Sequence, residues 1–205
     1  MRSATTNFLG TAAATAGPGQ IRTCAVAADS PRRDEAEGFI RAVFRRHYDA
    51  HVPCFAPNLL LIEEQDRVIA AAGWRGGNQK PLFLERYLDE PVEQLLERLS
   101  GQRLVRERLV EVGHLASEKP GGSLHVILAL AQHLARSGYE WVVFTATSEL
   151  VRIFTRLGLP LLALAAADPA RLGDEARDWG RYYDTQPVVV AGRIRLALER
   201  AGNMA

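Results

Sequence analysis

The sequence predicts an α/β protein with one mixed β-sheet and helices on both of its faces. Three observations lead to this class. Apolar runs of strand length alternate with segments whose apolar residues recur every three or four positions. A mostly apolar helical segment at 124–138 links apolar runs at 108–115 and 141–145, which indicates a crossover between parallel neighbours. An acidic turn at 63–66 separates two other apolar runs, the pattern of an antiparallel hairpin.

The first half of the chain supports this class element by element. A strand is expected at 21–27, and the Ser-Pro pair at 30–31 suits the N-cap and first position of a helix. Between 39 and 47 the apolar residues form one helical stripe, so this helix is expected to run to about Ala50. The two strands of the hairpin are expected within 58–75.

The second half alternates in the same way. Its expected elements, in chain order, are a strand at 81–88, a short helix from Pro91 to Gly101, a strand at 103–117, a helix at 124–138, a strand at 139–147, a helix at 148–158, and strands at 159–166 and 187–194. Gly101 is expected to end its helix because glycine readily adopts the left-handed conformation found there.

Composition narrows the function further. The chain has 205 residues, 47% of them hydrophobic, and a net charge of +1, which argues against a disordered protein and against electrostatically driven nucleic-acid binding. No apolar run approaches the ~18 residues of a membrane-spanning helix. Two cysteines cannot build a disulfide framework, so a cytoplasmic protein is expected. Residues 1–20 are small, polar and interrupted by glycine and proline, which predicts a disordered leader before one domain at 21–205.

Several sequence blocks, taken in order, resemble a known family. The blocks are LFLERYLDEPVE (82–93), VEVGHLAS (110–117), WVVFTAT (141–147), LGLPLLALAAAD (157–168), WGRYY (179–183) and PVVVAGRI (187–194). They resemble the thermostable haemolysin family, and the predicted order of elements resembles the GNAT acyltransferase fold, which acyl-homoserine-lactone synthases share. The resemblance implies a single GNAT-like acyltransferase domain.

The resemblance also implies a reaction. It implies an N-acyltransferase that moves an acyl group from a pantetheine thioester to the amine of a small metabolite, in biosynthesis of secondary metabolites. GNAT proteins hold the pantetheine arm where the fourth and fifth strands separate, because unpaired strand edges can bond an extended amide chain. The positions that correspond here are Leu115, Ala116 and Ser117 on one strand and Thr145 and Thr147 on the other.

The phosphate-binding loop bears on the choice of donor. The stretch 118–123 keeps Gly121, Gly122 and Ser123 ahead of a helix, where backbone N–H groups can bind phosphate. It also carries Glu118, whose charge opposes a pyrophosphate, and Pro120, which has no N–H. These departures favour a donor tethered to an acyl carrier protein over free acyl-CoA. The alternative is that Glu118 points to solvent and CoA binds. No resident cofactor is expected.

Glu111 and His114 are the candidate catalytic bases. A carboxylate in an apolar strand needs a task or a partner, and an ion pair with Arg75 or Arg108 is the structural alternative. The ordinary pKa of an imidazole suits a base at neutral pH, although a buried structural histidine is an equal alternative. A β-bulge near His114 would bring both side chains to one cleft.

Other side chains are predicted to contact the substrate. Arg75 and Glu85 are expected at the acceptor mouth, in contact with substrate or with each other; the aromatic candidates are Trp74, Trp179, Tyr182 and Tyr183. The tyrosine that serves as the general acid in GNAT proteins is replaced by Phe154; either the thiolate leaves without an acid, or Tyr182 or Tyr183 substitutes. Core packing is the alternative for these tyrosines and for Trp179.

Partners and rival functions complete the expectations. Arg32, Arg33, Arg45 and Arg46 could dock an acidic carrier protein, and a homodimer is compatible with the sequence. No metal site, membrane or nucleic acid is expected. The rivals are an acyl-homoserine-lactone-like synthase, a membrane-active haemolysin and a GNAT-like domain without catalytic activity.

Overall fold

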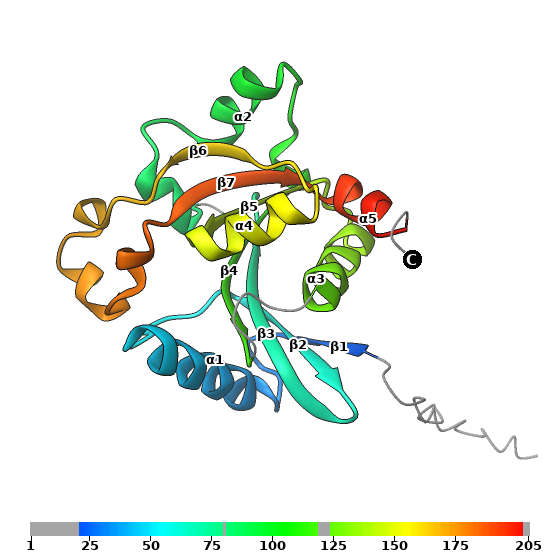
Figure 1. Ribbon diagram of the computed structural model, residues 1–205, viewed down its shortest axis with the longest axis vertical. Coiled ribbons are helices and arrows are strands. Elements are labelled where there is room, and N and C mark those ends of the chain that lie inside the picture. Colours follow the sequence, from blue (N-terminus) through cyan, green and yellow to red (C-terminus); the bar gives the residue numbers. More distant parts are fainter. Residues whose placement is uncertain (1–20, 80, 119–123, 203–205) are drawn as a thin grey trace, which may run out of the picture.

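A seven-stranded mixed sheet forms the centre of the computed structural model, in the order β1-β2-β3-β4-β5-β7-β6 (Figure 1). The structure describes residues 21–79, 81–118 and 124–202. The predicted leader at 1–20, and Gly121, Gly122 and Ser123 of the predicted phosphate loop, therefore lie outside the described residues. The strands are β1 (Ile21–Val26), β2 (Asn58–Glu64), β3 (Arg67–Gly76), β4 (Leu109–Ser117), β5 (Trp141–Ala146), β6 (Leu162–Ala166) and β7 (Val188–Arg193).

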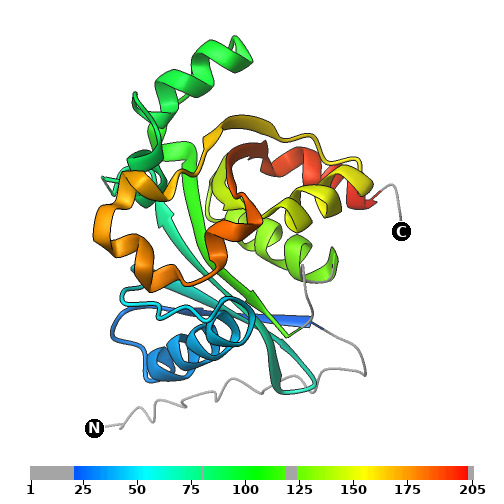
Figure 2. The same cartoon turned by 60° about the vertical axis from the view of Figure 1, so that its left-hand side comes forward.

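Helices occupy both faces of this sheet. The α-helices are α1 (Arg33–Tyr48), α2 (Val92–Ser100), α3 (Leu124–Arg136), α4 (Ser148–Arg156) and α5 (Ile194–Gly202), and the 3₁₀ helices are η1 (Phe83–Tyr87), η2 (Arg106–Arg108), η3 (Pro169–Trp179) and η4 (Tyr182–Thr185). Buried side chains of α3, α4 and α5 form one core with one sheet face. On the other face, α1 packs under the first strands, and η1, α2 and η3 pack under the last ones (Figure 2).

Most predicted elements are present. The neighbours β4 and β5 are parallel, as the crossover predicted, and every other strand pair is antiparallel. Gly101 ends α2 in the left-handed conformation, at φ 66°. Helix α1 begins at Arg33, two residues later than the Ser-Pro signal indicated, and the hydroxyl of Ser30 accepts the N–H of Arg32 at 3.3 Å.

Three predictions about elements were wrong. The expected strand at 81–88 is the 3₁₀ helix η1, because the N–H groups of Phe83 and Leu84 point to a carboxylate and not to a neighbouring strand. The expected strand at 103–117 begins only at Leu109, after the short helix η2. Helix α5 and the helical segment 169–185 were not predicted at all.

No helix among the described residues is both long enough and apolar enough to cross a bilayer.

Candidate active site

Strands β4 and β5 separate halfway along their length. Leu109 to Val112 pair with Trp141 to Phe144. Beyond these residues β4 continues to Ser117 alongside β3, and β5 continues to Ala146 alongside β7. Beyond Val112 on β4 and Phe144 on β5, the facing edges of the two strands therefore do not pair with each other (Figure 1). Their backbone groups are available to an extended chain, as the sequence predicted.

A β-bulge at His114 turns β4 toward the same place. The pairs Gly73–Gly113 and Ala71–Ala116 enclose one more residue on β4 than on β3, and His114 has φ 52°. A positive φ is uncommon for a residue with a Cβ, and bulges often redirect side chains beside active sites. Gly73 makes room for the ring, since a Cβ there would lie 3.0 Å from the His114 Nδ1. Glu111 and His114 consequently line one cavity.

This cavity has a volume of about 480 Å³ and lies between the sheet, α1, η1 and the segment 179–185. Of the predicted site residues, those that line it are Arg75, Glu111, His114, Leu115, Ser117, Thr145, Thr147, Trp179, Tyr182 and Tyr183. Trp74, Glu85 and Ala116 do not line it. The structure thus gathers most of the predicted residues in one place.

Glu111 is buried, with 7% of its surface exposed. Its carboxylate accepts the backbone N–H of Phe83 at 2.9 Å and that of Leu84 at 2.7 Å. Burial raises the pKa of Glu111, although these two N–H groups and the charge of Arg75 act in the opposite direction. The ion pair offered as its structural role is absent within the described chain, since Arg108 pairs with Glu140.

His114 lies among aromatic rings. Its ring stacks on Trp179, with centroids 6.1 Å apart and planes 21° apart, and lies 5.4 Å from the ring of Phe55. Its Nδ1 has no hydrogen-bond partner among the residues that the structure describes. Burial and the nearby charge of Arg75 lower the pKa of His114 to about 4. The imidazole is therefore neutral at neutral pH.

Tyrosines and a tryptophan form the opposite wall of the cavity. The hydroxyls of Tyr87 and Tyr183 are 2.6 Å apart, and the hydroxyl of Tyr182 donates to the Thr145 carbonyl at 3.3 Å. Trp179 lies 5.8 Å from both Phe83 and Tyr182, measured between ring centroids. Burial raises the pKa of Tyr182 and Tyr183, so their hydroxyls stay protonated and can donate.

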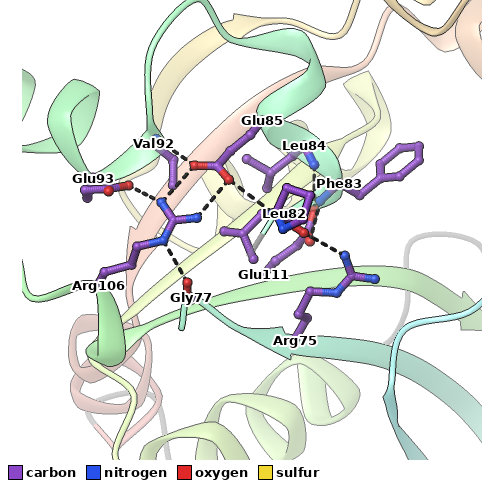
Figure 3. A network of polar contacts seen from close by, with 11 residues as sticks. Arg75, Gly77, Leu82, Phe83, Leu84, Glu85, Val92, Glu93, Arg106 and Glu111 are labelled. Carbon is purple, nitrogen blue, oxygen red and sulfur yellow. Dashed lines mark hydrogen bonds and ion pairs between the residues drawn. The ribbon is translucent and has the colours of Figure 1, made fainter. Parts of the chain in front are cut away.

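Glu85 belongs to a separate network and not to the acceptor mouth (Figure 3). Arg106 binds both oxygens of Glu85 at 2.8 Å, and the same carboxylate accepts the N–H groups of Leu82 and Val92. Arg106 also contacts Glu93 and donates to the carbonyl of Gly77. Burial alone would raise the pKa of Glu85, but Arg106 and the two N–H groups outweigh it and lower that pKa.

The predicted pairing of Glu85 with Arg75 was therefore wrong. Arg75 donates to the carbonyl of Pro81 at 2.9 Å. The prediction failed because the true partner, Arg106, lies 21 residues away along the chain.

The side chains of Trp74 and Ala116 point away from the large cavity. Trp74 lies on the α3 face of the sheet, where its ring is 6.0 Å from that of His133 and 5.8 Å from that of Tyr139. Its prediction as a substrate contact was wrong, because it is the cross-strand partner of Val112 and shares that residue's face. The side chain of Ala116 packs in the core beneath α1.

Glu118 has an ion-pair partner. Its carboxylate pairs with Arg67 at 2.6 Å, so its negative charge is partly balanced. Two of the arginines suggested for docking are also engaged, since Arg32 pairs with Glu35 and Glu63, and Arg33 pairs with Glu37.

A smaller apolar cavity of about 70 Å³ lies on the other face of the sheet, among α3, α4 and α5. It shares Val112, Leu115, Phe144 and Leu150 with the larger cavity, so the two spaces meet where β4 and β5 separate. Phe154 lines the smaller cavity and has no acidic proton. Within residues 21–79, 81–118 and 124–202, no cluster of three or more His, Cys, Asp or Glu side chains could hold a metal ion.

Sequence reasoning missed important members of the site. The N–H groups of Phe83 and Leu84 are backbone groups, which carry no signature of their own in the sequence. Phe55 lies outside the blocks that carry the resemblance, and Tyr87 lies within the block 82–93 but was not singled out there; the structure shows that both line the cavity.

Comparison with solved structures finds the same fold in several synthases. The LasI AHL synthase has a TM-score of 0.57 and 14% identity, over 88% of this chain and 95% of that one. FeeM, an N-acyl amino acid synthase from uncultured soil microbes, has a TM-score of 0.55 and 12% identity, over 88% and 96%. The CoA-dependent acyl-homoserine lactone synthase BjaI, solved with SAM and isopentyl-CoA, has a TM-score of 0.59 and 13% identity, over 88% and 87%.

The chain therefore has the GNAT-like fold that the sequence predicted. A family model described as "Thermostable hemolysin" matches residues 26–198, and the chain belongs to that family. No curated protein matches the sequence.

Proposed function

We propose that this protein is an N-acyltransferase that takes an acyl group from a pantetheine thioester and transfers it to the amine of a small metabolite. The separation of β4 and β5 beside a cavity that contains the buried carboxylate of Glu111 is the observation on which this rests. One groove then receives the donor, and the cavity receives the acceptor. The fold shared with LasI, FeeM and BjaI supports the same class of reaction.

The reaction forms one bond and breaks one bond. The acceptor nitrogen attacks the thioester carbonyl, the C–N bond forms, the C–S bond breaks, and the products are an amide and a free thiol. The acceptor ammonium loses two protons overall, one of which ends on the leaving sulfur while the other passes to solvent. The backbone N–H of Leu115, on the unpaired edge of β4, would polarise the thioester carbonyl. The N–H of Ala116 faces β3, because Glu118 donates to Ile69 in that ladder and the N–H direction alternates along a strand.

Glu111 is the base in this proposal. Its raised pKa makes it a stronger base than an ordinary carboxylate, whereas the pKa of His114, lowered to about 4, makes that imidazole a weak base. Neutral His114, stacked on Trp179, would form a wall of the acceptor cavity. The hydroxyl of Tyr183, which can accept from Tyr87, would donate a hydrogen bond to the leaving sulfur, whereas the hydroxyl of Tyr182 already donates to the Thr145 carbonyl.

The acyl chain would pass between β4 and β5 into the small apolar cavity. Val112, Leu115 and Phe144 border both spaces, so a chain that enters there leaves water without crossing a polar wall. The modest volume of about 70 Å³ favours a short acyl group.

For the donor, we propose an acyl carrier protein in preference to CoA. Pro120 supplies no N–H to a pyrophosphate, while Arg45 and Arg46 lie exposed on α1, near the cavity, and suit an acidic partner. The charge of Glu118 is a weaker reason than the sequence indicated, because Arg67 balances it.

Mass spectrometry tests the proposal. The protein is incubated with a set of short-chain acyl carrier proteins or acyl-CoAs and a mixture of amines, with the Glu111→Gln variant as the inactive control. An amide that forms in the carrier arm and not with the variant is the expected result. Amide formation in the CoA arm alone would overturn the carrier preference, and absence of amide from both arms would reject the N-acyltransferase.

A further inference from the structure

We infer that the acceptor is an α-amino acid whose carboxylate binds Arg75 while its amine faces Glu111. This inference rests on the proposed function and names the substrate class for the same cavity. It begins from Arg75, a cation that lines the cavity and has no anionic partner among the described residues.

Arg75 lies near the end of β3 and lines the large cavity. One terminal nitrogen, Nη1, donates to the carbonyl of Pro81 at 2.9 Å, and this bond holds the guanidinium in place. In the part of the chain that the structure describes, Arg75 forms no ion pair, whereas Arg86 and Arg106 nearby each bind a carboxylate. A fixed guanidinium with nitrogens to spare suits a carboxylate.

The cross-strand placement of the two charges favours an α-amino acid. Arg75 and Glu111 are cross-strand partners in the β3–β4 register, so their side chains leave the sheet side by side (Figure 3). The bond from Arg75 to Pro81, and the bonds that Glu111 accepts from Phe83 and Leu84, keep the two groups from pairing with each other. A ligand that bridges them needs a positive and a negative group close together, as on a single carbon.

The remaining wall indicates an apolar side chain on that amino acid. The rings of Phe83, Trp179 and Tyr183 line the cavity near Glu111. Phe83 touches Trp179 at 5.8 Å between ring centroids, and Arg86 lies over the outer face of Phe83 at 5.4 Å. Aromatic walls of this kind bury hydrocarbon or stack on rings.

A phosphate of the donor is the other anion that Arg75 could bind. Glu111, the partner of Arg75, lies in the paired part of β4, and Ser117 lies at the end that leads to the predicted phosphate loop. Six residues of strand separate the two, which is about 20 Å at ~3.3 Å per residue. A carboxylate of the acceptor is therefore the better match.

Binding measurements test the inference without any acyl donor. L-Phenylalanine, its methyl ester, phenethylamine and β-phenylalanine are titrated by calorimetry against wild type, Arg75→Met, Arg75→Lys and a control, Arg98→Met, whose side chain is 61% exposed on α2. Wild type and control should bind L-phenylalanine roughly 10–100-fold more tightly than phenethylamine or the ester, since a hydrogen bond to a charged group contributes about 1.5–3 kcal/mol. β-Phenylalanine should bind more weakly than L-phenylalanine.

The Arg75→Met variant should bind L-phenylalanine and phenethylamine alike, and Arg75→Lys should restore part of the preference. Equal binding of acid and amine by wild type, or a preference that survives in Arg75→Met, would overturn the inference. Circular dichroism checks that each variant is folded.

The same ligands, supplied with an acyl donor, separate the two ideas. Acylation of phenethylamine as fast as of L-phenylalanine would overturn the inference and leave the N-acyltransferase standing. Selective binding of L-phenylalanine through Arg75, without any acylation, would support the amino acid site while the proposed reaction fails.

Discussion

Two carboxylates bind the backbone around η1, one from η1 itself and one from β4, and their pKa values shift in opposite directions. Glu85 and Glu111 each accept two backbone N–H bonds from the segment 82–92. Glu85 also binds Arg106, and its pKa is lowered. Glu111 has no ion pair among the described residues, and burial raises its pKa. Since both carboxylates accept two N–H bonds, the opposite directions of their pKa shifts come from the ion pair of Glu85 with Arg106 and from the deeper burial of Glu111.

The two regions are nevertheless connected. Glu85 binds the N–H groups of Leu82 and Val92, which stand before and after η1, and Arg106 fixes this loop to the carbonyl of Gly77 (Figure 3). The N–H groups that hold Glu111 come from the same short helix. The ion-pair network thus orients the backbone that holds Glu111, the proposed base.

Removal of the Glu111 charge should have the largest effect. Glu111→Gln keeps the shape of the side chain but cannot accept a proton, so turnover should fall by roughly 10²–10⁴-fold. In the wild type, kcat/KM should fall as the pH drops through the raised pKa of Glu111, and the variant should lack this limb. The measurement is a pH–rate profile, with Glu140→Gln at an exposed ion pair as the control. A variant with the wild-type rate would mean that Glu111 is not the base.

Removal of the Arg106 charge should chiefly affect stability. Arg106 is 9% exposed, and Arg106→Met leaves the half-buried carboxylates of Glu85 and Glu93 without their cation. The free energy of unfolding should fall by about 3–5 kcal/mol, the usual result of breaking a buried ion pair on one side. Arg108→Met, at a side chain that is 58% exposed and pairs with Glu140, should cost no more than about 1 kcal/mol. Urea unfolding measures both, and equal losses would contradict the structural role of Arg106.

A third test measures how His114 makes the stability of the protein depend on pH. The pKa of His114 is lowered to about 4, so between about 4 and the ordinary 6.5 the unfolded chain binds the proton and the folded chain does not. Stability from this group is therefore present above pH 6.5 and is lost as the pH falls toward 4, by up to about 3 kcal/mol. The raised pKa of Glu111 acts with the opposite sign, because the folded chain then holds the extra proton.

The matched variant isolates the histidine. His114→Asn suits the left-handed backbone at this position and removes the titrating group. Glu111 contributes equally to the unfolding free energies of wild type and variant, so its contribution cancels when the two are subtracted. The remaining difference should shrink as the pH is lowered from 6.5 to 4. A difference that does not change with pH would show that His114 titrates normally in the folded protein.

Local patterns predicted the framework of the fold, whereas long-range contacts determined what they missed. The apolar runs of β4 and β5 and the crossover helix α3 were visible because burial imposes periodicity. Their separation and the groove followed from the resemblance. The sequence did not show that Glu85 pairs with Arg106 and not with Arg75, because the ion pair between Glu85 and Arg106 joins residues far apart in the chain. Segment 169–185 has little periodicity, and yet it supplies Trp179 and Tyr182 to the cavity.

The extra residue in β4 has a consequence for changes in chain length. In a regular strand, the side chains at 111 and 114 would point to opposite faces of the sheet. The added residue interrupts the alternation, so both side chains reach the same face. Deletion of a single amino acid between Gly113 and Ala116 would restore a regular ladder with β3. Such a shortened strand would keep Glu111 in place, but the backbone offered to the donor would shift by one residue. We therefore expect substitutions along this edge to be tolerated more readily than a change in its length.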